Sequence, residues 1–125
     1  MKITLDQFLI RKKNLKENTE IQIISGSMEP FIYTGEKVKC SPCNFENSVI
    51  GDPIIFWSDN KLICHFLIAK HKTEKGNFIE TRGLNRFYND PIISEKFIFA
   101  KVTSPKISWF KKQIFQLFNR FYKKP

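Results

Sequence analysis

The sequence predicts a mainly β domain with a small antiparallel, barrel-like core, a short helix before it and an amphipathic helix after it. Between residues 20 and 102, short apolar runs alternate with turn residues at intervals of about ten residues, a pattern typical of small closed antiparallel sheets. The chain has 125 residues, of which 42% are hydrophobic. This is enough for one domain with a single core.

The expected elements follow from local patterns. Leu5, Phe8 and Leu9 recur at helical spacing and Thr4 can cap, which predicts a helix over residues 4–16. Strands are expected over residues 20–25, 35–40, 54–57, 62–69, 78–81 and 96–102. Turns are expected at residues 51–53, 58–61 and 75–77, and loops at residues 42–47 and 82–92.

A different segment begins at Ser104, which can cap a helix, and Pro105 suits its first position. Six apolar residues of this segment fall on one helical face: Ile107, Phe110, Ile114, Leu117, Phe118 and Phe121. Six Lys or Arg residues and no acid accompany them, in a chain of net charge +9. We therefore expect a β domain over residues 1–103 and a basic amphipathic helix over residues 104–125.

Such a cationic helix suits an anionic membrane surface, and packing on the β core is an equal alternative. Base-stacking motifs are absent, so nucleic acid is not an expected partner. No apolar run reaches the roughly 18 to 20 residues of a membrane span, and the N-terminus is too short and too polar for a secretory signal. We expect a cytoplasmic protein, with a peripheral position at the inner membrane face left open.

Three cysteines, an odd number, argue against a disulfide framework. Cys40 and Cys43 form a single C-x-x-C, best interpreted as a chance or structural pair. A redox pair, or a zinc site completed by Cys64 and a histidine, remains the alternative. No metal or cofactor is expected in the functional site.

The segment Ser25–Pro30, with the sequence Ser-Gly-Ser-Met-Glu-Pro, follows an apolar run and is the most informative motif. Gly26 allows close approach of the backbone to a ligand, and Pro30 disfavours helix at the residue before it. This arrangement can present a serine hydroxyl at the edge of a sheet. It resembles the nucleophile box of signal peptidase I, Ser-x-Ser-Met-x-Pro, in which the serine before Met attacks.

Three further segments resemble the same family, in the same order, so that the resemblance covers roughly residues 20–103. Gly51–Phe56 is similar to its Gly-Asp-x-Val-x-Phe strand. Ile63–Ile68 is similar to its base-bearing strand, with His65 at the position of the histidine-type enzymes. Glu80–Asp90 is similar to their Thr-Lys-Gly-Asp-Asn-Asn…Asp-Asp box, with Leu84 in place of the first Asp.

The resemblance implies a serine endopeptidase that cleaves a peptide or a leader or signal-like segment of a precursor, as in peptide maturation. It implies Ser27 as nucleophile, His65 as general base and Asp90 as the orienting carboxylate. The Ser27 N–H and the Ser25 hydroxyl would stabilise the oxyanion. Substrate would add as a β-strand beside a groove lined by Ile23, Ile24, Met28 and Cys64.

Two features leave an alternative open. A histidine within an apolar strand is, by itself, more often a core residue, and Asp90 before Pro91 also suits a turn. Leu84 removes one carboxylate of the family pattern, and the membrane helix that ordinary signal peptidases carry before the serine is missing. The alternative is a weak or inactive relative that binds a peptide strand in the same groove.

Overall fold

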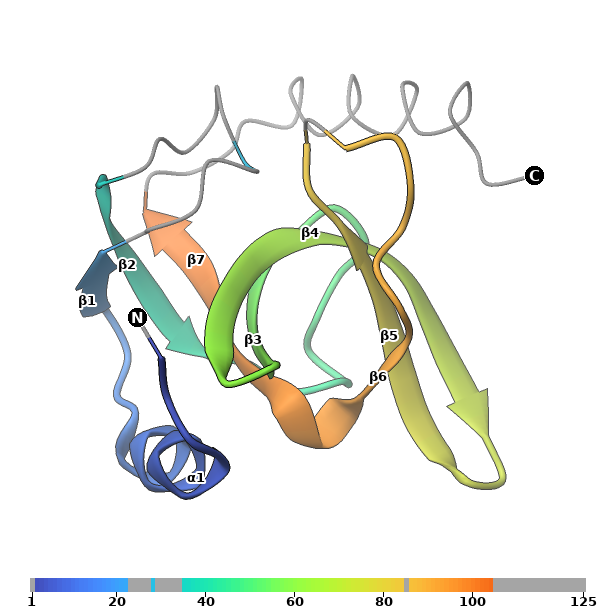
Figure 1. The fold of residues 1–125 in the computed structure, drawn as a ribbon, viewed down its shortest axis with the longest axis horizontal. Coiled ribbons are helices and arrows are strands. Elements are labelled where there is room, and N and C mark those ends of the chain that lie inside the picture. The colour runs from blue at the N-terminus through green and yellow to red at the C-terminus, as the bar shows by residue number, and fades with distance from the viewer. Residues whose placement is uncertain (1, 23–27, 29–34, 85, 105–125) are drawn as a thin grey trace.

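The computed structural model describes residues 2–22, 28, 35–84 and 86–104. Within these residues the chain forms a seven-stranded antiparallel sheet that curls on itself, preceded by a short helix (Figure 1). The elements are α1 (Leu5–Asn14), β1 (Thr19–Gln22), β2 (Lys37–Pro42), β3 (Pro53–Ser58), β4 (Lys61–Thr73), β5 (Gly76–Arg82), β6 (Ile93–Ser94), a 3₁₀ turn η1 (Glu95–Phe97) and β7 (Ile98–Ser104). The expectation of a mainly β, antiparallel fold is confirmed.

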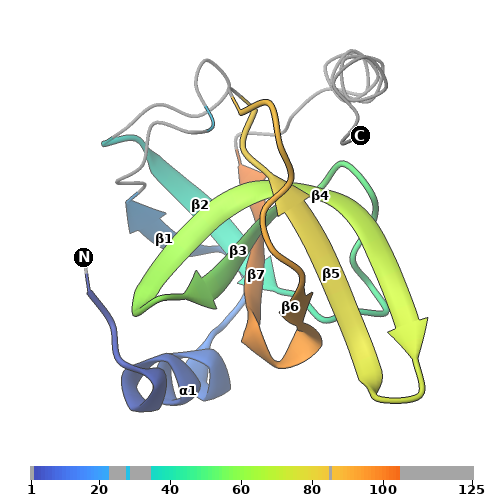
Figure 2. The same ribbon diagram turned by 45° about the vertical axis from the view of Figure 1, so that its right-hand side comes forward.

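The strands lie in the order β1-β2-β7-β3-β4-β5-β6. The long strand β4 joins the two halves of the sheet, because its first part pairs with β3 and its second part with β5. Figure 2 shows β4 as a strongly curved arch. The β4–β5 register shifts between Leu67 and Ala69, and such an irregularity increases local twist and bending.

The β3–β4 hairpin turns at Asp59 and Asn60, whose φ angles are 55° and 60°. Two successive positive φ values are typical of the type I′ turn, which matches the twist of the flanking strands. The turn also holds the N-terminal segment, since the Ile3 N–H donates to the Asn60 carbonyl oxygen at 2.7 Å.

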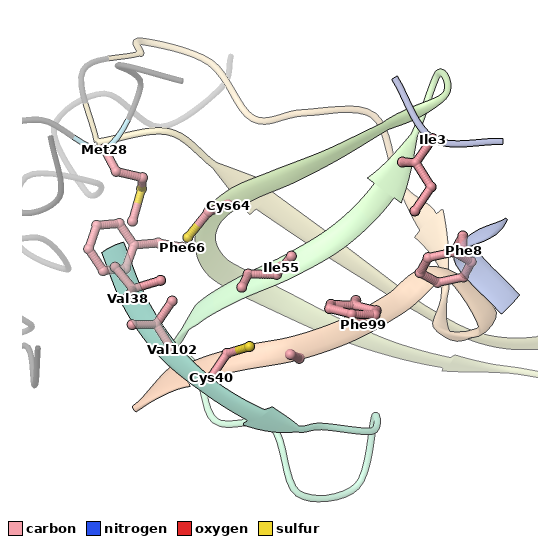
Figure 3. Close-up of a cluster of buried hydrophobic side chains, with 11 residues drawn as sticks. Ile3, Phe8, Met28, Val38, Cys40, Ile55, Cys64, Phe66, Phe99 and Val102 are labelled. Atoms are coloured by element: carbon pink, nitrogen blue, oxygen red, sulfur yellow. The ribbon is translucent and has the colours of Figure 1, made fainter. Parts of the chain in front are cut away.

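The buried side chains form two clusters. The first core cluster is made by Ile3, Phe8, Met28, Val38, Cys40, Ile55, Cys64, Phe66, Phe99, Ala100 and Val102 (Figure 3). The second core cluster is made by Cys43, Phe45, Ile54, Phe56, Leu67, Ile79 and Ile98. Adjacent residues of β3, such as Ile54 and Ile55, enter different clusters because side chains alternate across a strand.

Helix α1 is fixed by its cap and by one buried aromatic residue. Thr4 and Gln7 form a reciprocal capping box. Phe8 is fully buried, with its ring centroid 6.0 Å from that of Trp57 and 5.9 Å from that of Phe99. The predicted helix and its Thr4 cap are therefore confirmed, with the helix ending at Asn14.

The predicted C-terminal strand differs from the observed one. It was expected over residues 96–102, but Glu95–Phe97 forms the 3₁₀ turn and β7 spans Ile98–Ser104. The Ser94 hydroxyl oxygen accepts from the Lys96 N–H and caps this turn, and the Phe97 ring lies 5.5 Å from that of Trp57. Packing on Trp57 thus favours a turn where the β-prone sequence suggests strand.

Smaller differences concern the ends of elements. Strand β6 lies just beyond the expected 82–92 loop, and Pro42 belongs to β2 rather than to the loop after it. Residues 105–125 lie outside the described residues, so the C-terminal helix stays a prediction. Among the described residues, no helix is both long and apolar enough to cross a membrane.

Candidate functional site

His65 lies in the middle of β4, opposite Ile54 of β3, and only 8% of its surface is exposed. Its ring meets the Phe56 ring edge-on, at 6.0 Å between centroids. Its Nδ1 atom is 2.5 Å from Oδ2 of Asp90, which lies 25 residues further along the chain. The structure therefore brings together two of the three residues of the predicted triad.

Asp90 is held in place by the last part of β5. Its backbone N–H donates to the Thr81 carbonyl oxygen at 2.7 Å. The Thr81 hydroxyl, on a residue that is 1% exposed, donates to Asp90 Oδ2 at 2.7 Å. Pro91 follows and favours an extended backbone at the residue before it. The carboxylate that faces His65 is thus oriented from both its backbone and its side chain.

The Gly51-Asp52 pair extends the pairing of β3 with β4 past His65. The Gly51 N–H donates to the Leu67 carbonyl oxygen, and the Leu67 N–H donates to the Asp52 carbonyl oxygen, each at 2.8 Å. Asp52 Oδ2 accepts from the Val49 N–H at 2.8 Å, which closes the turn before β3. The φ of 96° at Gly51 is a left-handed value that favours glycine. These contacts hold the strand that carries His65.

Leu84 occupies the position at which the resemblance leads one to expect a first aspartate. It is half-buried and packs against the first core cluster. The apolar side chain therefore takes a packing role, and the carboxylate that contacts His65 comes from Asp90.

Four of the expected site residues, Ser25, Ser27, Ile23 and Ile24, lie outside the described residues. The other two residues expected to line the groove, Met28 and Cys64, are 1% and 4% exposed and belong to the first core cluster (Figure 3). Their side chains are packed in the core. Any contact of theirs with substrate would go through backbone atoms.

The cysteines do not gather into a ligand set. Cys40 and Cys64 belong to the first core cluster, whereas Cys43 belongs to the second. Burial raises the thiol pKa to about 11 for Cys40 and Cys43 and to about 12 for Cys64. These thiols are protonated at neutral pH, although the thiolate is the form that attacks and binds metal. In the part of the chain that is described, no three His, Cys, Asp or Glu side chains are grouped to hold a metal ion.

A second histidine–carboxylate pair lies beside the first, and sequence reasoning missed it. His71 Nε2 is 2.7 Å from Glu80 Oε1, and Glu80 Oε2 accepts from Asn89 Nδ2 at 3.3 Å. The His71 side chain is 40% exposed. The β4–β5 register decides this pairing, and no local sequence signal reveals it.

Lys70, also on β4, is a candidate for an alternative base of the lysine type. Its Nζ donates to the Ser48 carbonyl oxygen at 2.9 Å and lies 4.7 Å from the centroid of the Phe45 ring. These contacts give Lys70 a structural partner at the second core cluster and do not support the alternative.

Comparisons with family models, curated proteins and solved structures found no match to this chain. The interpretation of the site therefore depends on its own geometry and on the four sequence segments described above. Of these, the histidine strand and the box ending at Asp90 are in direct contact.

Proposed function

We propose that the protein is a serine endopeptidase that cleaves a peptide, or a leader or signal-like segment of a precursor protein. Ser27 is the nucleophile, His65 the general base and Asp90 the residue that orients the base. The contact between His65 Nδ1 and Asp90 Oδ2 is the observation that carries this proposal. A carboxylate on Nδ1 is what a catalytic histidine needs, because it selects the tautomer with the other nitrogen ready to accept a proton.

The proposed chemistry follows from these roles. Nε2 of His65 takes the proton of the Ser27 hydroxyl as Oγ attacks the scissile carbonyl carbon. The Ser27 N–H and the Ser25 hydroxyl donate to the oxyanion. The carbon–nitrogen bond breaks, the leaving amine receives the proton from His65, and water then hydrolyses the acyl-enzyme ester by the same route. Asp90 stabilises the imidazolium in both halves.

Met28, which follows Ser27 in the sequence, is buried in the same core cluster as Cys64 and Phe66, the two chain neighbours of His65.

A peptide substrate would pair as an added strand beside Ile23 and Ile24, with main-chain hydrogen bonds providing affinity. The basic segment 105–124 would hold the protein at an anionic membrane surface through its charge and its apolar face. A cap on the β core remains the alternative for this segment.

The decisive experiment compares cleavage of a peptide library by the wild type and by Ser27→Ala, with products identified by mass spectrometry. Ser104→Ala is the control, because Ser104 is exposed at the end of β7. We expect cleavage by the wild type and the control, none by Ser27→Ala, and an electrophilic peptide-mimetic inhibitor bonded to Ser27. Equal cleavage by the wild type and Ser27→Ala would contradict the proposal.

A second candidate is a relative that binds a peptide strand without cleaving it. The packing of Leu84 against the first core cluster, at a position where the family pattern has a carboxylate, favours it. In the same experiment this candidate predicts no cleavage by either the wild type or Ser27→Ala. In a direct binding assay it predicts that both chains bind peptide with equal affinity.

A further inference from the structure

We propose that Glu80 is a positioning residue for the His65–Asp90 pair and that it acts through Asn89. The proposal rests on the proposed peptidase function for its catalytic meaning. Its structural content, that Glu80 fixes the geometry of the His65–Asp90 contact, can be tested without any catalysis.

Two consecutive residues of β5 hold two consecutive residues of the β5–β6 connection. Thr81 holds Asp90 through one backbone and one side-chain hydrogen bond, each of 2.7 Å. Glu80 holds Asn89 through its Oε2 atom, at 3.3 Å from Nδ2. The segment that presents the carboxylate to His65 is therefore attached to β5 at two neighbouring points.

Glu80 is itself anchored, which allows it to act as a support. Its other oxygen, Oε1, lies 2.7 Å from Nε2 of His71 on β4, and the Glu80 side chain is 21% exposed. Both carboxylate oxygens are thus engaged, one with the sheet and one with the connection. His65 and His71 belong to the same strand, so β4 contacts Asp90 directly and contacts Asn89 through Glu80.

The Glu80–Asn89 contact lies next to the two hydrogen bonds by which Thr81 holds Asp90. Strand β5 ends at Arg82 and β6 begins at Ile93, and the connection departs at the end of the sheet opposite to α1 (Figures 1 and 2). Phe87 and Tyr88, just before Asn89, are 67% and 59% exposed. Because Asn89 is bonded to Asp90, loss of the Glu80 contact should let Asp90 move relative to His65. A displacement of about 1 Å in a catalytic group can lower a rate by about 100-fold.

The first test is nuclear magnetic resonance of the full-length Ser27→Ala chain, which excludes any effect of self-cleavage. The chain has two histidines, so the ring signals of His65 can be assigned by comparison with His71→Ala. The measured signal is the resonance of the proton between His65 Nδ1 and the Asp90 carboxylate. Asp90→Ala lacks this contact and serves as the reference in which the signal is lost. We expect Glu80→Ala and Asn89→Ala each to broaden or shift this signal.

Glu74→Ala is the matched control, because Glu74 is an exposed carboxylate in the β4–β5 turn. It should leave the shared-proton signal as in the parent chain. Glu80 lies in strand β5, so Glu80→Ala can fail to fold. Asn89 lies outside the strands, and Asn89→Ala then provides the test of the same contact. An unchanged signal in Asn89→Ala, or in a folded Glu80→Ala, overturns the proposal.

The second test is kinetic and uses the Ser27 chain. We expect Glu80→Ala and Asn89→Ala each to lower kcat by about 10- to 100-fold, with KM within about twofold of the wild type. The double variant should be no worse than the more affected single variant, because both remove the same contact. Glu80→Gln keeps a side-chain oxygen for Asn89 and should recover most of kcat.

The two proposals fail in different ways. If the resonance changes as expected but no variant or wild-type chain cleaves peptides, the proposed peptidase function is wrong and the positioning role stands. If the wild type cleaves and kcat is additive in the double variant, the positioning role is wrong and the peptidase function stands.

Discussion

Replacing Thr81 by Val should weaken the fold and the candidate site together. Valine has nearly the shape of threonine but lacks the hydroxyl that donates to Asp90 Oδ2 at 2.7 Å, at a residue that is 1% exposed. A hydrogen bond to a charged group contributes about 1.5–3 kcal/mol. We therefore expect the free energy of unfolding to fall by about 2 kcal/mol, corresponding to a drop in Tm of several degrees, about 5–10 °C.

The assay is urea denaturation of the wild type, Thr81→Val and the control Thr73→Val. The Thr73 hydroxyl donates to the Gly76 carbonyl oxygen in an exposed turn, so its loss should cost less than about 1 kcal/mol. If the proposed function is correct, peptide cleavage should fall in Thr81→Val and stay normal in Thr73→Val. If Thr81→Val unfolds within about 0.5 kcal/mol of the wild type, the hydrogen bond does not hold Asp90 as described.

Three further predictions concern the core and the tail. Phe8→Ala should lower the free energy of unfolding by about 3–5 kcal/mol. Leu9→Ala, at a residue that is 50% exposed, should change it by less than about 0.5 kcal/mol. Equal effects of the two substitutions in urea denaturation would contradict the packing of α1. Burial raises the pKa of the Cys64 thiol from 9.0 to about 12, so the thiol ionises at a lower pH in the unfolded chain than in the folded one. The protonated thiol therefore stabilises the fold fully below pH 9, and this stabilisation is lost as the pH rises towards 12. By pH 11 the loss should approach about 2–3 kcal/mol, and a Cys64→Ala chain with the same slope between pH 9 and 11 would contradict it. A chain ending at Ser104 should co-sediment less with anionic vesicles at low salt than the full chain. Equal co-sedimentation of the two chains would exclude a membrane anchor. A shortened chain that fails to fold would indicate that the segment is a structural cap.

The local elements were predictable because their signals lie within a few neighbouring residues. The helix is capped by Thr4 and Gln7, and the hairpin turns at Asp59 and Asn60. The strands form from the apolar runs. The same locality explains the error at Glu95–Phe97, where a β-prone sequence forms a 3₁₀ turn because Phe97 packs on a distant tryptophan.

The candidate site was predictable only in part. The segments that resemble signal peptidase I pointed to His65 and Asp90 before their contact was known, and the structure confirms that the two side chains meet. The roles of Thr81 and Glu80 had no local signal, since each acts on a residue nine positions away in the chain. The burial of Met28 and Cys64 was also missed, because an apolar residue in a motif can face either the core or a ligand.

The sequence by itself determined most of the helix, strand and turn segments, and which residue types are present for chemistry. Only the tertiary structure decided which of them meet. The contact of His65 with Asp90, and that of His71 with Glu80, requires the register of β4 against β5 and the path of the chain after β5. Register is set by the packing of the whole sheet, because a slip of one residue would turn every side chain of a strand to the opposite face.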